Sequence, residues 1–276
     1  MAEFQDKFVT VNGLKLHYLD WGNPDKMPMV LLHGLTGNAH NWDDLVPHFC
    51  DQYHIIALDQ RGRGDSDWAP DGAYRVEDYA SDMMGLANEL GLGRFVLIGV
   101  SMGGRNALLY TSSQWRRVHK LVVVDIAPDI DPKGAARISG YVGGAPEEFA
   151  DLDEVVAWAK SNYTFLTEEA LLRRMFYSVK ELPNGKLGWK YDKAVRQQRR
   201  DGTQPAAPDL WYLIGRIKAP TLLVRGAQSD ILSKETARKM EAVMLDCRLV
   251  EVPGVGHAPT LEEPEALEAV KAFFTD

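Results

Sequence analysis

The stretch "LIGVSMGGRNALLY", residues 97–110, is an apolar run that ends in glycine, turns through a serine and restarts at helical spacing. The run before the serine predicts a buried strand, and the spacing after it predicts a helix. Gly99 and Gly103 flank Ser101 at two-residue spacing, where a tight turn crowds its neighbours. Such a turn places the hydroxyl at a helix N-terminus, beside free backbone N–H groups. The pattern G-x-S-x-G in this setting predicts a nucleophilic serine.

Short apolar runs without alternation recur on both sides of this turn, and they are "MVLLHG", "HIIALD", "KLVVVD", "TLLVRG" and "RLVEVPG". Runs of this kind are typical of strands that are covered on both faces of a mostly parallel sheet. Helical stretches lie between them, as at 74–91 and 262–274, and segment 7–22 predicts an antiparallel hairpin around Asn12-Gly13. We therefore expect an α/β fold with a doubly wound, mostly parallel β-sheet.

One long interval, between residues 129 and 219, contains no convincing strand for most of its length. It consists of predicted short helices separated by glycine and proline, at 146–163, 167–179 and 192–202. An insertion of this length is better interpreted as a separate folded unit than as a structureless loop. We expect a core in two parts, residues 1–130 and 207–276, with a helical cap over 131–206 inserted after the sixth strand.

The composition excludes several classes of protein. A net charge of −8 spread over 276 residues argues against nucleic acid or an anionic membrane as the main partner. The two cysteines match neither a disulfide framework nor a metal-ligand spacing, and no apolar run is long enough to span a bilayer. The first residues, "MAEFQDKFVTV", do not resemble a signal peptide. We expect a soluble cytoplasmic protein, a monomer or weak homodimer, without metal or cofactor.

A nucleophilic serine needs a base, because its hydroxyl is barely ionised at neutral pH. Of the seven histidines, His257 stands out, because it lies in a glycine-rich loop between the last predicted strand and the C-terminal helix. Two aspartates, Asp125 and Asp230, follow predicted strands and are candidates to orient this imidazole. Asp230 is preferred because it follows the penultimate strand and precedes the histidine in chain order. Asp125 is interpreted as a carboxylate that orders the loop at the cap entrance.

The loop "HGLTG", residues 33–37, leaves a predicted strand and is lined with glycine. Its Leu35 N–H and the Met102 N–H are the expected donors to a developing oxyanion, whereas His33 is interpreted as a structural histidine of the turn. The stretch "RQQRR", 196–200, is interpreted as a solvated helix face rather than as an anion site. Bulky side chains near the loop and in the cap predict an apolar acyl pocket. The candidates to bind substrate are Trp42, Trp158, Phe176 and Trp189.

The motifs "HGLTG", "DQRGRGDS", "GVSMGG", "RGAQSD" and "GVGHAP" occur in this order, and with them nearly the whole chain resembles the α/β-hydrolase superfamily. The branch most similar to it is that of capped serine carboxylesterases and lactonases, including enzymes that open acyl-homoserine lactones. The resemblance implies Ser101 as nucleophile, His257 as base and Asp230 as orienting acid, acting on a small-molecule ester or lactone through an acyl-enzyme. Two alternatives remain open: a carbon–carbon bond hydrolase of ring-cleavage products, and a non-catalytic receptor on the same fold.

Overall fold

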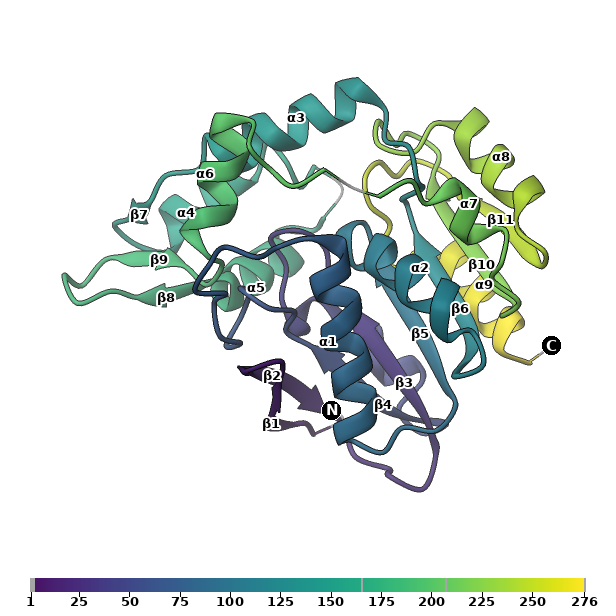
Figure 1. Ribbon diagram of the computed structural model, residues 1–276. Helices are drawn as coiled ribbons and strands as arrows, with labels where there is room; N and C mark the ends of the chain where they lie inside the picture. Colours follow the sequence, from purple (N-terminus) through teal and green to yellow (C-terminus); the bar gives the residue numbers. More distant parts are fainter. Residues whose placement is uncertain (1–2, 165, 207, 276) are drawn as a thin grey trace.

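The computed structural model describes residues 3–164, 166–206 and 208–275 (Figure 1). Within these ranges the main sheet has eight strands in the order β1-β2-β4-β3-β5-β6-β10-β11. Their bounds are β1 Gln5–Val11, β2 Leu14–Asp20, β3 Met27–Leu32, β4 Tyr53–Leu58, β5 Phe95–Val100, β6 Val118–Val124, β10 Thr221–Gly226 and β11 Cys247–Val252. The β1–β2 and β2–β4 pairs are antiparallel and the other pairs are parallel. The predicted sheet and its edge hairpin are confirmed.

Helices cover both faces of this sheet. One face packs against α1 Val76–Glu89, α2 Met102–Gln114, α7 Trp211–Ile214 and α8 Lys234–Val243. The other packs against α9 Pro264–Thr275 and two 3₁₀ helices, Ala39–Trp42 and Val46–His48. Within β5, Leu97 belongs to the first core, whereas Val96 and Ile98 belong to the second, and all three are fully buried. Burial on both faces explains why the strands contain continuous apolar runs.

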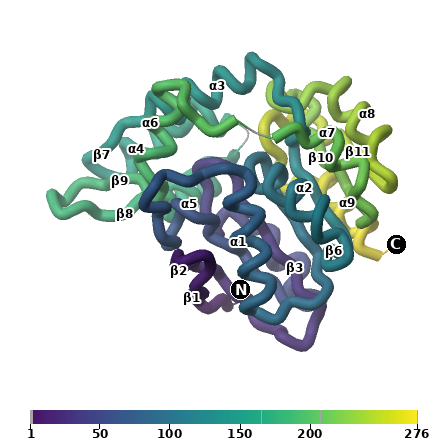
Figure 2. The backbone as a smooth tube through the Cα atoms, in the orientation of Figure 1, coloured from purple at the N-terminus to yellow at the C-terminus, as the bar shows by residue number. Residues whose placement is uncertain are grey.

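Between β6 and β10 the chain leaves the sheet and forms a separate unit, called the insert here and defined as residues 132–201 (Figure 1, Figure 2). Its elements are α3 Pro132–Gly143, β7 Glu148–Phe149, α4 Leu152–Ala159, α5 Glu168–Ser178, β8 Val179–Glu181, β9 Leu187–Trp189 and α6 Lys193–Asp201. They share a hydrophobic core that includes Phe149, Val155 and Met175. Figure 2 shows the chain leaving β6, entering the insert at α3 and returning to the core at α7.

The insert differs from its predicted form in two respects: it begins with a helix that was not expected, α3, and it contains a small sheet. The three expected helices are present, but β7, β9 and β8 also form a three-stranded antiparallel sheet. Its strands are at most three residues long, too short for an alternating pattern to appear in the sequence. The expected boundary at residue 207 lies outside the described residues. None of the helices in the described ranges is long and apolar enough to cross a lipid bilayer.

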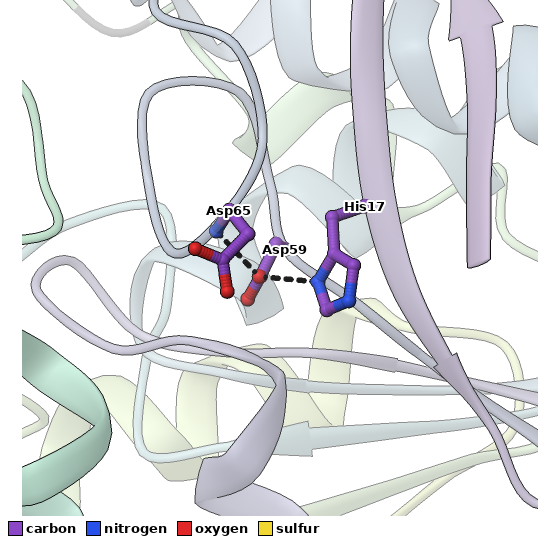
Figure 3. Close-up of side chains that lie close together, drawn as sticks. All are labelled: His17, Asp59 and Asp65. Atoms are coloured by element: carbon purple, nitrogen blue, oxygen red, sulfur yellow. Dashed lines mark hydrogen bonds and ion pairs between the residues drawn. The ribbon is translucent and has the colours of Figure 1, made fainter. Parts of the chain in front are cut away.

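A buried carboxylate, Asp59, anchors the loop that follows β4. Its Oδ2 accepts hydrogen bonds from His17 Nδ1, at 2.7 Å, and from the Asp65 backbone N–H, at 2.9 Å (Figure 3). Its Oδ1 accepts one from the Ala39 backbone N–H, at 2.6 Å. Both oxygens are therefore occupied by hydrogen-bond donors of the chain itself. The cluster of His17, Asp59 and Asp65 holds this loop against β2 and the first 3₁₀ helix.

Candidate active site

Ser101 lies on a sharp turn between β5 and α2. Its φ of 53° is unusual for a residue with a side chain, and such conformations cluster at functional sites. The turn is so tight that a Cβ on Gly99 would lie 2.4 Å from the Gly103 carbonyl oxygen. A Cβ on Gly103 would lie 2.2 Å from the Leu32 carbonyl oxygen. Both glycines of the G-x-S-x-G pattern are thus required by close backbone contacts.

The serine is the first member of a chain of hydrogen bonds. Its Oγ–H donates to His257 Nε2 at 2.9 Å, and His257 Nδ1–H donates to Asp125 Oδ2 at 2.8 Å. Because a carboxylate only accepts hydrogen bonds, the proton of the neutral imidazole lies on Nδ1 and the Nε2 lone pair faces the serine. The Asp125 side chain is fully buried and that of His257 is 8% exposed. The arrangement allows His257 to take the serine proton.

Asp125, rather than Asp230, is the carboxylate at the imidazole, which corrects the expectation drawn from chain order. β6 lies between β5 and β10 in the sheet, so the residue that follows β6 is adjacent to both the serine turn and the end of β10. Asp125 Oδ1 accepts from the Gly226 backbone N–H at 3.1 Å, and its Oδ2 accepts from Ser229 Oγ at 2.6 Å. These bonds fix the orientation of the carboxylate toward His257.

Asp230 has a different partner. Its side chain is 36% exposed and accepts two hydrogen bonds from Arg137 of α3, from Nε at 2.5 Å and from Nη2 at 2.8 Å. The hydrogen bond from Arg137 holds the pKa of this carboxyl below its ordinary value. Asp230 therefore joins the core to the insert.

The two expected amide donors, Leu35 and Met102, both line the cavity at Ser101. A buried guanidinium that sequence reasoning missed, Arg63, contacts both of them: its Nε donates to the Leu35 carbonyl at 3.0 Å, and its Nη2 lies 3.6 Å from Met102 Sδ. Arg63 lies in the loop after β4. Strand β4 pairs with β3, which leads into the loop of Leu35, so Arg63 and Leu35 lie at the same edge of the sheet. His33 accepts from the Gln60 backbone N–H at 3.0 Å, and burial lowers its pKa to about 4. This agrees with a structural role for His33.

A cavity of about 490 Å³ opens between the core and the insert, and Ser101 and His257 are part of its lining. Of the four aromatic candidates, Trp42 lines this cavity and the other three do not. Trp158 stacks on Tyr141 with ring centroids 4.1 Å apart, and Trp189 Nε1 donates to the Pro146 carbonyl at 2.9 Å. Both belong to the insert's own core, whereas Phe176 is 59% exposed.

Glu262, in the loop after His257, also lines the cavity, and burial, with the nearby charge of Glu263, raises its pKa to about 7. The folded pKa lies above the ordinary value of 4.5, so this group stabilises the fold below about pH 4.5, and the contribution is lost as the pH rises through 7. We expect Glu262→Gln, which cannot ionise, to raise Tm at pH 8.5 by about 2 °C and to have less effect toward pH 4. Melting curves of this variant and of the exposed control Glu268→Gln test this. An equal shift at both pH values would contradict the assignment.

Comparison with known proteins gives matches to hydrolases, both in sequence and in structure. A family model described as the alpha/beta hydrolase fold matches residues 27–264. The chain is similar to a 3-hydroxybutyrate-oligomer hydrolase of Cupriavidus necator, at 32% identity over 95% of this chain and 93% of that protein. It is 28% identical to a 2-(acetamidomethylene)succinate hydrolase of Mesorhizobium japonicum, over 89% of this chain and 87% of that protein. A crystal structure of an alpha/beta hydrolase from Novosphingobium aromaticivorans has a TM-score of 0.89 and 33% identity, covering 100% of this chain and 99% of the other.

Proposed function

The chain belongs to the α/β-hydrolase fold family, and from that premise we propose that it is a serine hydrolase that cleaves carboxylic esters or lactones through an acyl-enzyme. The observation that carries this proposal is the hydrogen-bonded chain from Ser101 through His257 to Asp125. A hydroxyl, a neutral imidazole and a buried carboxylate in this order form the arrangement that activates serine for acyl transfer.

In the proposed mechanism, His257 Nε2 accepts the Ser101 proton while Oγ bonds to the substrate carbonyl carbon. The negative charge then develops on the carbonyl oxygen, where the Leu35 and Met102 N–H groups stabilise it. The imidazolium, held by Asp125, gives its proton to the departing alkoxide, and the alcohol leaves. Water, deprotonated by His257, attacks the acyl-enzyme; this releases the acid and restores the serine. In a lactone the leaving alcohol stays tethered to the acyl group, so the same steps open the ring.

The insert acts as a cap in this proposal, because residues of α3, α5 and α6 line the cavity above the serine. The name of the Cupriavidus relative supports the choice of reaction, since hydroxy acids join to one another through ester bonds. Acyl-homoserine lactones are cyclic esters, and their hydrolysis would follow the same steps.

A panel of substrates tests the proposed reaction. It contains p-nitrophenyl esters, simple lactones, acyl-homoserine lactones and a diketone acid produced by aromatic ring cleavage. We expect kcat/KM for the best ester or lactone to exceed that for the diketone acid by about 100-fold or more, equivalent to a difference in activation free energy of about 2.7 kcal/mol. Turnover of the diketone acid alone would establish carbon–carbon bond hydrolysis instead. No turnover of any member would favour a non-catalytic receptor.

A further inference from the structure

The cavity has a charge opposite to that of the whole chain. The chain has a formal net charge of −8, yet the described residues that line the cavity include six arginines and three carboxylates. The arginines are Arg63, Arg75, Arg105, Arg173, Arg174 and Arg199, and the carboxylates are Asp44, Glu262 and Glu263. Arg173 forms an ion pair with Asp44, which removes one charge of each sign. The remaining lining has an excess of positive charge.

Of the five lining arginines that form no ion pair with a described residue, three act on one another electrostatically, Arg63, Arg105 and Arg199. No carboxylate oxygen of a described residue lies within 4.0 Å of any of the three guanidinium groups. Arg63 is 1% exposed and lies against the rings of Tyr74 and Tyr79, with its Cζ 5.1 and 5.4 Å from their centroids. These ring faces attract the cation but do not neutralise it.

Arg105 has a buried donor without a hydrogen-bond partner in the described part of the chain. Its Nη2 donates to the Pro128 carbonyl at 2.9 Å, but its buried Nε has no hydrogen-bond partner among the described residues. Asp129 acts on Arg105 only at longer range, and its Oδ2 accepts a hydrogen bond from Trp211 Nε1 at 2.7 Å. A buried, unsatisfied donor on a cation is costly and requires an explanation.

Arg199 is close enough to both Arg105 and Arg63 for their charges to repel. Burial lowers the pKa of Arg105, and the charge of Arg199 lowers it further. Burial likewise lowers the pKa of Arg199, and the charge of Arg63 adds to this effect. Repulsion between cations that are withdrawn from water favours binding of an anion between them. Guanidinium groups suit a carboxylate especially well, because two N–H groups match its two oxygens.

Arg105 and Arg199 bring positive charge to the cavity that contains Ser101, one from the core and one from the insert. Arg105 lies one turn along α2 from Ser101, and Arg199 lies on α6 of the insert. Arg199 lines the cavity and Arg196 is buried, so two arginines of the stretch 196–200 are not on a solvated face, contrary to the interpretation from sequence.

We propose that Arg105 and Arg199 form an anion subsite, and that the natural substrate carries a free carboxylate that this subsite binds while Ser101 attacks the ester carbonyl. The identity of the scissile bond rests on the proposed function, but the subsite is a property of the cavity itself. The carboxylate belongs either to the acyl part or to the alcohol part of the ester. In both cases the substrate carboxylate lies between the core and the insert.

Two pairs of substrates, each differing only by a methyl group on the carboxylate, test the subsite. For the acyl part, mono-p-nitrophenyl glutarate is compared with its methyl ester; for the alcohol part, 3-(butanoyloxy)butanoate is compared with its methyl ester. We expect the free acid of at least one pair to have a kcat/KM about 10-fold higher or more, as for a hydrogen bond between charged groups. The pair that shows the preference identifies the part of the substrate that carries the carboxylate. Preference for the methyl ester in both pairs would overturn the proposal.

Variants on one helix provide the matched control. Arg199→Met should lower the ratio of kcat/KM for acid over methyl ester by about 10-fold. Lys193→Met removes an exposed cation from the same helix and should leave that ratio unchanged. Equal changes in the two variants would indicate a general field effect and overturn the subsite. If melting curves show that Arg199→Met is unfolded, Arg105→Lys is tested instead. It retains the positive charge but loses the paired N–H donors of the guanidinium, and it should lower the same ratio.

A binding measurement separates this proposal from the proposed reaction. Calorimetric titration of Ser101→Ala with monomethyl glutarate requires no turnover, and we expect Kd to rise about 10-fold when Arg199→Met is added. Binding that depends on Arg199, in a protein that hydrolyses no ester, would leave the subsite standing and refute the reaction. Ester hydrolysis without carboxylate binding or preference would refute the subsite and leave the reaction standing.

Discussion

Replacing Ser101 with alanine is expected to lower kcat for ester hydrolysis by about 10⁶-fold, the size of loss found when the nucleophile of a serine hydrolase is removed. In the proposed mechanism Oγ is the atom that bonds to the substrate carbonyl carbon, and its hydrogen bond to His257 Nε2 is the path by which its proton leaves. The residual rate would come from the oxyanion donors and from substrate binding alone. The measurement is kcat with p-nitrophenyl butanoate, on protein whose melting curve matches that of the wild type.

A second serine on the same helix serves as the control. Ser112 lies in α2, and its Oγ donates to the Leu109 carbonyl at 2.7 Å, away from the cavity. Ser112→Ala should therefore keep wild-type kcat. A folded Ser101→Ala protein that retains kcat within tenfold of wild type would exclude Ser101 as the nucleophile.

Asp125→Asn is expected to lower kcat by about 10⁴-fold with the fold intact. An amide at this position can donate to Nδ1, which moves the imidazole proton to Nε2. A protonated Nε2 cannot accept the Ser101 proton, so the base is lost although all the atoms remain in place. The measurement is again kcat, together with a melting curve, because the carboxylate also accepts hydrogen bonds from Gly226 and Ser229.

Asp230→Asn is the matched comparison, since it makes the same chemical change at the other strand-end aspartate. It weakens a partly exposed ion pair with Arg137, for which a loss of at most about 1 kcal/mol of stability is usual. We expect kcat within about tenfold of wild type and Tm lower by about 2 °C. The opposite pattern, with Asp230→Asn inactive and Asp125→Asn active, would show that Asp230 rather than Asp125 orients the His257 imidazole.

The parts of the site that the sequence predicted are those determined by local backbone. The strand, the tight turn and the helix around Ser101 lie within one continuous stretch, and their glycines are explained by contacts within the turn and with the neighbouring strand. The sequence predicted His257 as the base because it lies in a glycine-rich loop between the last strand and the C-terminal helix. Sheet order, in contrast, is a property of the folded molecule. Chain order favoured Asp230, whereas the position of β6 between β5 and β10 brings Asp125 to the imidazole.

The lining of the cavity was less predictable for a related reason. Whether an aromatic residue of the insert faces the cavity or the insert's own core depends on how short helices and strands pack, and Trp158 and Trp189 face the core. The same limit applies to the basic stretch 196–200. Helical spacing alone indicates a charged face, and only the docking of α6 over the core makes Arg199 part of the cavity.

The central claim is that Ser101 is the residue that becomes acylated, and the most direct test is the stoichiometry and position of a covalent label. The protein is treated with a fluorophosphonate, which reacts with activated serine hydroxyls, and residual ester hydrolysis is compared with the number of labels per chain from intact mass and peptide mapping. We predict one label per chain, located on Ser101, with activity falling in proportion to labelling. Complete loss of activity with the label on another residue, or full activity with Ser101 labelled, would contradict the account.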